Sequence, residues 1–259
     1  MALDLSKFTV QKAKPAPVML LLDVSGSMSG VKIDTLNEAV KSMLDTFTDA
    51  TTSETDFVVS IITFGEELKR LFPFTPATTV KFENLSASGC TPLGEALKMA
   101  KAIIEDRDET PSRAYRPMVV LVSDGQPTDE WQQPLQTFIS DGRSAKCDRM
   151  AMAIGSDADR SVLGSFVEGT GNPLFEAHRA SEIRNFFKRV TMTVTTRTMQ
   201  PTIKTTVKED VPPTVRDSAA NDSHSATPEP RRTTVNVTLD GPTMKVGEEE
   251  SPNEDEEFF

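Results

Sequence analysis

The chain has 259 residues, of which 37% are hydrophobic, and its formal net charge is −11 at pH 7. This length is enough for one α/β domain with a sizeable core, or for such a domain plus an extension. An acidic chain without a basic stripe repels a phosphate backbone, which argues against a nucleic-acid partner. No apolar run is long enough to cross a bilayer and no secretory signal precedes residue 18, so we expect no membrane span and a cytoplasmic location.

The two cysteines, Cys90 and Cys147, are too far apart in sequence to form a metal-binding motif. We expect both to be small buried thiols in a reducing compartment. Nothing in the sequence around either of them indicates a lowered thiol pKa.

The amino-terminal part of the chain predicts a leader, a buried strand and a helix. Residues 1–14 are expected to be mobile or to add an edge strand. Residues 18–22 form a continuous apolar run, which is typical of a strand buried on both faces. After a serine-rich turn, apolar side chains recur at steps of three or four and predict one side of a helix that covers the sheet. These side chains are Ile33, Leu36, Val40, Leu44 and Phe47.

The following segments alternate between strand-like and helix-like patterns. Helices are predicted after Thr91-Pro92, with Thr91 at the N-cap position, and at 163–167 and 183–190. This alternation predicts an α/β fold, with a doubly wound, mostly parallel sheet and helices on both faces, in a single domain over residues 15–197. The further strands are expected at 57–64, 66–74 (a hairpin partner of the strand before it), 118–122, 150–154 and 174–175.

Residues 198–259 are expected to be a flexible acidic tail, because the composition there changes to Thr, Pro, Asp, Ser and Glu. Within it, residues 229–240 are a candidate short linear motif. Thr233 and Thr234 follow two arginines there, and could be phosphorylated and read by a phosphothreonine-binding partner. Acids near the end of the tail could also dock into a metal site of the same or a neighbouring molecule. The simpler interpretation of both features is a solvated tail.

Oxygen-bearing side chains occur in three loops of the predicted sheet. Asp23, Ser25 and Ser27 follow the first strand, Thr91 precedes a helix, and Asp124 follows the strand at 118–122. In a doubly wound sheet, the loops at the carboxyl ends of neighbouring strands converge at the switch point of the strand order. Hydroxyl and carboxylate oxygens suit a hard divalent cation, Mg²⁺ in particular, and neutral hydroxyls leave it with affinity for one more anionic oxygen.

A plainer interpretation is that the hydroxyls cap helices and the two aspartates lie in ordinary turns. For any one loop this interpretation is favoured, because short motifs occur by chance. Three loops in the right order, each next to a predicted strand end or helix start, favour the metal site instead.

The three loops are similar to those of the von Willebrand factor A domain family. DVSGS at 23–27 resembles its D-x-S-x-S signature, and Thr91 in GCTPLGEAL and Asp124 in VSDGQPTD resemble its second and third loops. The resemblance covers roughly residues 18–190 and implies a Rossmann-like fold with an intact metal-ion-dependent adhesion site. It implies one Mg²⁺ or Mn²⁺ ion, with Ser25, Ser27 and Thr91 as direct ligands and the two aspartates bound directly or through water.

The same resemblance implies a binding module, because in this family an Asp or Glu of a protein partner completes the coordination of the metal. Phrases such as LLLDVSGSM and TPLGEAL further resemble the tellurium-resistance TerY group within the family. This narrower resemblance implies a stress response with a link to phosphorylation.

The sequence argues against catalysis. Aspartate-nucleophile phosphatases also begin with an aspartate after a buried strand, but they need a second acid two residues later, where this chain has Ser25. The histidines, His178 and His224, have no catalytic partner nearby in sequence, and no nucleotide-binding or nucleophile-elbow motif is present. A divalent-metal phosphatase or hydrolase is the alternative, and a metal-free structural subunit the second alternative. Trp131, just after the third loop, either contacts a partner beside the metal or packs its helix onto the sheet.

We therefore expect a non-enzymatic, metal-dependent adaptor or scaffold that binds an acidic residue of a protein partner in a tellurium-resistance or related stress-response complex. Its tail is expected to meet a kinase, a phosphatase or a phosphothreonine-binding protein.

Overall fold

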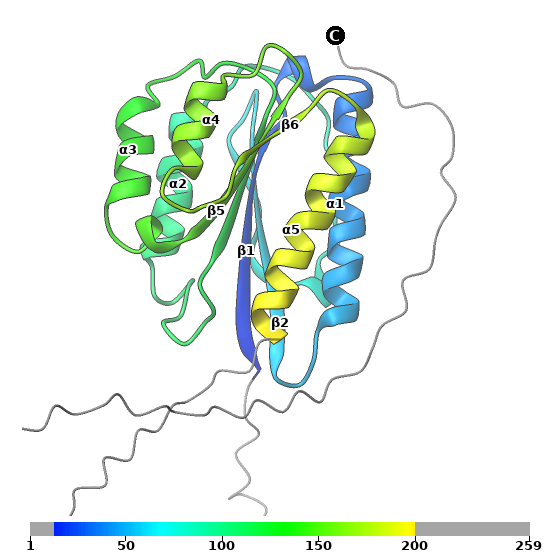
Figure 1. Ribbon diagram of the computed structural model, residues 1–259, viewed down its shortest axis with the longest axis vertical. Coiled ribbons are helices and arrows are strands. Elements are labelled where there is room, and N and C mark those ends of the chain that lie inside the picture. Colours follow the sequence, from blue (N-terminus) through cyan, green and yellow to red (C-terminus); the bar gives the residue numbers. More distant parts are fainter. Residues whose placement is uncertain (1–12, 200–259) are drawn as a thin grey trace, which may run out of the picture. The chain divides into compact units, whose positions relative to one another are not determined.

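The computed structural model describes residues 13–199, and all structural statements below refer to them. They form a six-stranded sheet between two layers of helices (Figure 1). The strand order is β3-β2-β1-β4-β5-β6, and the strands are parallel except for β3, which runs antiparallel to β2. The strands are β1 (Lys14–Asp23), β2 (Thr55–Phe64), β3 (Lys69–Pro76), β4 (Met118–Ser123), β5 (Asp148–Ile154) and β6 (Leu174–Ala177). The predicted fold class is confirmed, including the hairpin made by β2 and β3.

Helices cover both faces of this sheet. In Figure 1, α1 (Val31–Ala50) and α5 (Ala180–Met199) lie side by side on one face. The other face carries α2 (Leu93–Glu105), α3 (Gln132–Ser140) and α4 (Arg160–Val167). Short 3₁₀ turns lie at Gly26–Met28, Ala77–Thr79 and Ser144–Lys146.

The central strands supply one apolar core to each face. In β1, Leu20 and Leu22 pack with α1 and α5, whereas Met19 and Leu21 pack with α2. All four are completely buried. Because successive side chains of a strand point to opposite faces, a strand covered on both faces must be apolar at every position, which is the pattern of residues 18–22.

Strand β1 begins four residues before its apolar run, at Lys14. Its first residues pair with β2 on one side, and on the other side Tyr115 N–H donates a hydrogen bond to Pro15 O over 2.8 Å. Pro15 and Pro17 lack an N–H, so they fit this end of the strand, where no ladder with β4 is formed. Residues 14–17 therefore belong to an interior strand and not to an edge strand.

Helix α5 is longer than the predicted segment at 183–190, and α3, the helix expected at Trp131, had no predicted bounds. The second half of α5 is rich in threonine, a poor helix former. Its hydroxyls donate to carbonyls one turn earlier, as Thr191 Oγ1 does to Phe187 O over 2.8 Å, and Val194 is buried against the sheet. Tertiary packing therefore outweighs propensity there.

The carboxyl ends of β1 and β4 leave the sheet together. Leu22 pairs with Val122 in parallel register, so Asp23 and Ser123 come side by side. Between these two strands the connections turn in opposite directions, and this is the switch point at which doubly wound sheets bind ligands.

The predictions for residues 1–12 and for the tail from residue 200, including 229–240 with Thr233 and Thr234, lie outside the described residues. None of the helices found within 13–199 is both long enough and apolar enough to cross a membrane.

Candidate metal centre

The first and third loops meet at the switch point through their side-chain oxygens. Ser25 N–H donates to Asp23 Oδ1 over 2.8 Å, and Ser25 Oγ lies 3.1 Å from Ser27 Oγ. Ser27 Oγ donates to Asp124 Oδ1 over 2.7 Å, and Ser123 Oγ donates to Asp23 Oδ2 over 2.5 Å. Both aspartates are completely buried. The two loops, about a hundred residues apart in sequence, therefore share one hydrogen-bonded network of carboxylates and hydroxyls.

Thr91 reaches the same place from the second loop. A methyl group built on Gly125, next to Asp124, would lie 3.5 Å from Thr91 Oγ1 and 3.7 Å from Ser27 Oγ. The second and third loops are also joined directly, because Thr128 N–H donates to Thr91 O over 3.0 Å and Thr91 N–H donates to Thr128 Oγ1 over 3.1 Å. The structure thus brings all the predicted metal-site residues to one end of the sheet.

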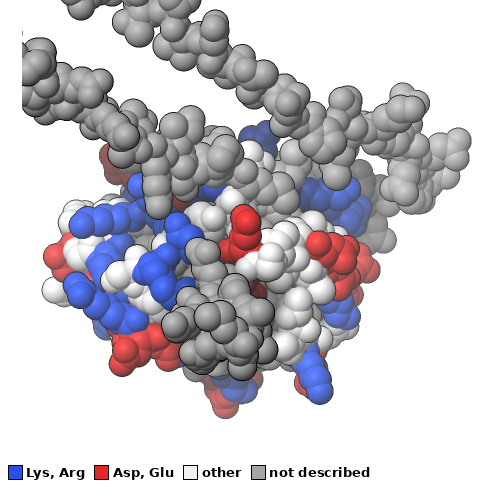
Figure 2. All heavy atoms as spheres, turned by 90° about the horizontal axis from the view of Figure 1, so that it is seen from below, with Lys and Arg blue, Asp and Glu red and all other residues white. Residues whose placement is uncertain are grey.

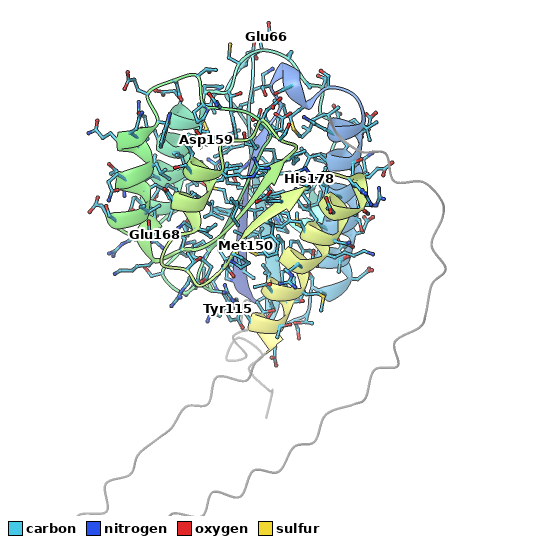
Figure 3. The ribbon with its side chains drawn as sticks, turned by 45° about the horizontal axis from the view of Figure 1, so that its top comes forward. Glu66, Tyr115, Met150, Asp159, Glu168 and His178 are labelled. Atoms are coloured by element: carbon cyan, nitrogen blue, oxygen red, sulfur yellow. The ribbon has the colours of Figure 1, made fainter. Side chains whose placement is uncertain are left out.

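Backbone hydrogen bonds hold the first and second loops together. Gly26 N–H donates to Gly89 O over 3.0 Å, and Ser88 N–H donates to Val24 O over 2.8 Å. Gly89 has a φ of +79°, and a Cβ there would lie 2.3 Å from the backbone of Glu66, which Figure 3 labels at this end of the domain. Only glycine fits such a position. The site is therefore built on loops whose spacing is fixed by the backbone.

Helix α2 is capped differently from the sequence prediction. Its N-cap residue is Pro92 and not Thr91, and it makes no side-chain cap bond. Instead, the carboxylate of Asp129 accepts from Gly94 N–H over 3.0 Å and from Glu95 N–H over 2.9 Å. An acceptor from the third loop thus satisfies the first turn of α2, so the Thr91 hydroxyl is not needed as a cap.

Lys32 is a residue of this site that the sequence analysis missed. Its Nζ lies 2.7 Å from Asp124 Oδ2, and the lysine side chain is only 16% exposed. A lysine in the first turn of a helix opposes the helix dipole, and α1 begins at Val31. The ion pair with Asp124 compensates for this position. In the sequence, the only sign of this role was the position of Lys32 next to the start of a predicted helix, where a basic residue is unfavourable.

Asp23 is an ionisable group in an unfavourable environment. Burial raises its pKa to about 6, hydrogen bonds from Ser123 and Ser25 oppose this shift, and the charge of Asp124 adds to it. A divalent cation beside the two carboxylates would favour their ionised forms.

The donor set fits a hard divalent cation better than a soft one. It consists of two carboxylates and three hydroxyls: Asp23, Asp124, Ser25, Ser27 and Thr91. Within residues 13–199, no group of three or more His, Cys, Asp or Glu side chains is placed to hold a metal, so a thiolate- or imidazole-based site is not present in this part of the chain. Oxygen donors of this kind suit Mg²⁺, and neutral hydroxyls leave it with affinity for a further anionic oxygen.

The other residues singled out from the sequence lie near this end or in the core. Trp131 is half-buried at the start of α3 and packs against the core on the α2 side of the sheet. The expectation for Cys90 is wrong, because its side chain is exposed. The next residue, Thr91, is buried. Cys147 is buried as expected, and burial raises the pKa of its thiol to about 12.

Residues 18–126 match the family model of the von Willebrand factor type A domain. The chain is 29% identical to inter-alpha-trypsin inhibitor heavy chain H2 of Mus musculus over 170 residues, which are 60% of this chain and 17% of that protein. Among solved structures, von Willebrand factor type A from Catenulispora acidiphila has 20% identity and a TM-score of 0.56, covering 71% of this chain and 43% of that one.

A second solved structure is proximal thread matrix protein 1 from the mussel byssus, described with zinc in its MIDAS motif, the metal-ion-dependent adhesion site. It has 16% identity and a TM-score of 0.50, and covers 70% of this chain and 48% of that one. The described residues therefore have the von Willebrand factor A-type fold, and the chain spans only a small part of the length of the curated relative.

Proposed function

We propose that this protein is a metal-dependent protein-interaction module. Asp23, Ser25, Ser27, Thr91 and Asp124 hold a divalent cation at the switch point of the sheet, and an aspartate or glutamate of a protein partner binds the outer side of that ion. When bound, the ion supplies the positive charge that attracts the partner's carboxylate. The chain's own residues would fix the position of the ion, and the two carboxylates would balance its charge.

The observation that supports this proposal most directly is the joint network of the first and third loops. Ser27 bridges Ser25 of its own loop to Asp124 of the other, with oxygen contacts of 3.1 and 2.7 Å. If these hydroxyls only capped helices, or if the aspartates lay in ordinary turns, a hydroxyl that bridges two loops would not be expected. Ser27 is exposed whereas both aspartates are completely buried, so a partner would approach from the Ser27 side.

Finer parts of the proposal are supported by the sequence resemblance. We propose that the ion is Mg²⁺ or Mn²⁺, and that the protein acts without catalysis as an adaptor or scaffold in a cytoplasmic tellurium-resistance or related stress response. We also propose that residues 198–259 serve as a tail that meets a kinase, a phosphatase or a phosphothreonine-binding partner through Thr233 or Thr234. The match of residues 18–126 to the von Willebrand factor type A family model supports the interaction role over the phosphatase alternative.

Thermal unfolding in EDTA and then in Mg²⁺, Mn²⁺ or Zn²⁺ tests the metal site. Zn²⁺ is included because the mussel protein is described with zinc in its MIDAS motif. At a metal concentration of about 100 times Kd, binding to the folded state adds ~2.7 kcal/mol and should raise Tm by roughly 5–10 °C. No rise with any of these ions would contradict the proposal and favour a metal-free structural subunit.

A pair of matched serine variants shows whether the named oxygens carry the effect. Ser25→Ala removes a hydroxyl of the network and should abolish most of the rise in Tm. Ser29→Ala is the control, because its exposed hydroxyl donates only to Gly26 O, over 2.8 Å, and lies outside the donor set. An equal loss in both variants would mean that the serine-rich loop is only structural.

Affinity capture with and without chelator tests the partner half of the proposal. Proteins released by EDTA should be retained again on addition of the metal, and should be lost with Asp23→Ala. Hydrolysis of a generic phosphate ester in Mg²⁺ is measured in parallel, and metal-dependent turnover that Asp23→Ala abolishes would favour the phosphatase alternative.

A further inference from the structure

The end of the sheet opposite the metal site carries a basic surface. Figure 3 labels Tyr115 at this end and Glu66 at the other. Seen from this end, Lys and Arg side chains gather on one side of the face, with uncharged surface between them (Figure 2). These cations come from separate segments of the chain, which is why the sequence shows no basic stripe. They include Lys14, Arg113, Arg116, Arg143, Lys146 and Arg197.

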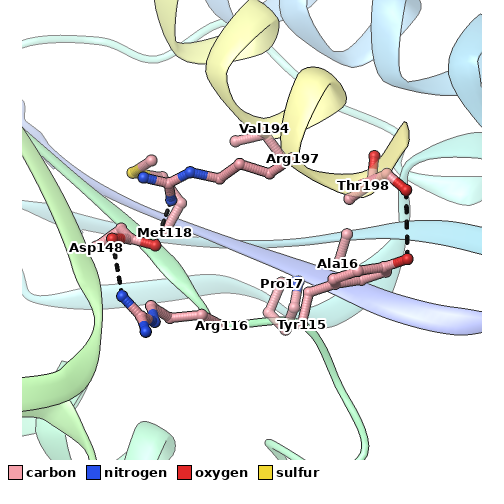
Figure 4. A pocket seen from close by; sticks show the side chains of 9 residues that line it. All are labelled: Ala16, Pro17, Tyr115, Arg116, Met118, Asp148, Val194, Arg197 and Thr198. Atoms are coloured by element: carbon pink, nitrogen blue, oxygen red, sulfur yellow. Dashed lines mark hydrogen bonds and ion pairs between the residues drawn. The ribbon is translucent and has the colours of Figure 1, made fainter. Parts of the chain in front are cut away.

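A cleft of about 220 Å³ lies at the centre of this surface, between the start of β1 and the last turns of α5. Figure 4 shows its apolar side, formed by residues such as Pro17, Met118 and Val194, and its polar side, where Arg116 and Arg197 both pair with Asp148. Two guanidinium groups share this one carboxylate. The Arg116 side chain is 67% exposed, so its remaining donors face solvent.

A second cleft, of about 340 Å³, adjoins the first and shares Tyr115 and Arg116 with it. Arg143 and Lys146 also line it, and no acidic side chain does. Above the Tyr115 ring, Lys14 Nζ lies 3.8 Å from the ring centroid. Basic side chains therefore line both clefts, and the first cleft also contains Asp148.

This combination selects a ligand with negative charges next to a large apolar side chain. The first cleft, of about 220 Å³, has an apolar side that suits an aromatic ring, and exposed cations beside it, such as Arg116, suit carboxylates. A polyanion such as a nucleic acid is disfavoured by the net charge of −11 and by Asp148 within the cleft.

We propose that the acidic segment Glu254-Asp255-Glu256-Glu257-Phe258-Phe259 of the same chain binds this basic cleft. The segment carries four acids and no base, directly followed by two aromatic side chains. The chain also leaves the described domain at the cleft, because Thr198 lines it and Tyr115 OH donates to Thr198 O over 3.3 Å. A segment tethered at its own binding surface binds at an effective concentration far above that of a free peptide. This contact uses a surface distinct from the metal site and does not require the metal.

The chain provides its own probe, because Tyr115 is its single tyrosine. The full chain labelled with 3-fluorotyrosine gives one ¹⁹F resonance that reports on the cleft. Phe258→Ser/Phe259→Ser should shift this resonance, and a synthetic peptide of sequence EDEEFF added to that variant should return it to its original position. Peptides EDEESS and QNQQFF are the controls for the aromatic and the acidic parts.

Substitutions on the domain locate the binding surface. Arg116→Gln/Lys146→Gln should raise the Kd of the EDEEFF peptide about tenfold or more, a loss of about 1.4 kcal/mol. Lys41→Gln/Lys188→Gln removes two exposed lysines of α1 and α5 outside the cleft and should leave Kd within a factor of two. Thermal unfolding of each variant verifies that it is folded.

Several outcomes would overturn the proposal. An unchanged ¹⁹F resonance after loss of both phenylalanines would show that the segment does not occupy the cleft. A resonance that moves on addition of EDTA would show that occupancy of the cleft depends on the metal, which contradicts a contact that does not require it. A resonance that depends on protein concentration would assign the contact to a second copy. Displacement of the resonance by anionic lipid vesicles or by DNA, but not by EDEEFF, would assign the surface to a membrane or a nucleic acid.

Discussion

At the scale of single residues, the buried Asp23 of the candidate metal site lowers the stability of the folded domain when it is ionised. Asp23 is completely buried, and burial raises its pKa to about 6 from an ordinary value of 3.8. Between these two pH values the folded state binds more protons than the unfolded state. The free energy of unfolding therefore falls as pH rises through this window, and the loss is complete above about pH 7.

Asp23→Asn should therefore stabilise the protein in EDTA while abolishing metal binding. At pH 8 we expect a gain of ~1–3 kcal/mol in the free energy of unfolding, because the amide keeps the shape without the buried charge. At pH 4 the gain should shrink to a small part of this value, since Asp23 is then almost fully protonated in the folded state and about half protonated in the unfolded state. Urea unfolding at pH 4 and pH 8 measures the effect, and a variant destabilised at pH 8 would contradict this account.

Lys32 should tune the affinity of the site for a cation. Its ammonium group, 2.7 Å from Asp124 Oδ2, competes with any positive ion for that carboxylate. Lys32→Met should thus tighten metal binding by roughly fivefold to tenfold, measured by calorimetric titration, while lowering stability in EDTA. The matched control is Lys41→Met, an exposed lysine of the same helix. Weaker metal binding in Lys32→Met would show that the ammonium supports the site instead of competing with it.

The sequence could predict the oxygen donors but not their neighbours. Asp23, Ser25 and Ser27 stand together directly after an apolar strand, so local pattern and strand order place them at the switch point. Lys32 stands next to a helix start, but its pairing with Asp124 is a long-range contact that no local period marks, and the same is true of the contact between Asp129 and α2. The exposure of Cys90 depends on which way a loop turns, which composition does not determine.

At the scale of elements, the loops depend on a close backbone approach that the sequence marks only by a glycine. Gly89→Ala should displace the second loop from the first, because its Cβ would lie 2.3 Å from the Glu66 backbone. We expect a loss of about 2–4 kcal/mol in stability and at least tenfold weaker metal binding. Urea unfolding and calorimetric titration measure these two quantities.

Gly171→Ala is the control for Gly89→Ala, because it introduces the same backbone strain without a steric clash. Gly171 has nearly the same backbone angle, with a φ of +77°, but nothing lies within 4 Å of its built Cβ. The free energy of unfolding of this variant should fall by only about 1–2 kcal/mol, because of the left-handed backbone conformation alone, and the variant should bind metal normally. If both variants lose metal affinity equally, the collision at Gly89 is not what fixes the loops.

Strands were easier to predict from the sequence than helices, for a physical reason. A strand segment buried on both faces must be apolar at every position, as residues 18–22 of β1 and 118–122 of β4 are, so composition alone reveals it. Helix α3 buries only Pro134, Leu135 and Phe138 among polar residues, too short a stripe to stand out. The end of α5 depends on contacts with the sheet that only the folded chain provides.

At the scale of the whole molecule, folding brings together cations that are scattered along the sequence. The sequence shows an acidic chain, with a net charge of −11, and suggests no basic surface. Folding gathers cations from the start of β1, the loop before β4, the segment before β5 and the end of α5 onto one end of the sheet. The candidate metal site lies at the other end, so one domain presents two surfaces of different chemistry.

These two surfaces should act independently, because they share no residue and lie at opposite ends of the sheet. Asp23→Asn should abolish metal binding without changing the Kd of the EDEEFF peptide, and Arg116→Gln/Lys146→Gln should do the reverse. Combined, the substitutions should give the sum of the separate effects on each binding free energy to within about 0.5 kcal/mol. Calorimetric titrations of metal and peptide into the variants measure this additivity. A coupling above about 1 kcal/mol would mean that the ends communicate, and metal binding would then control release of the acidic segment.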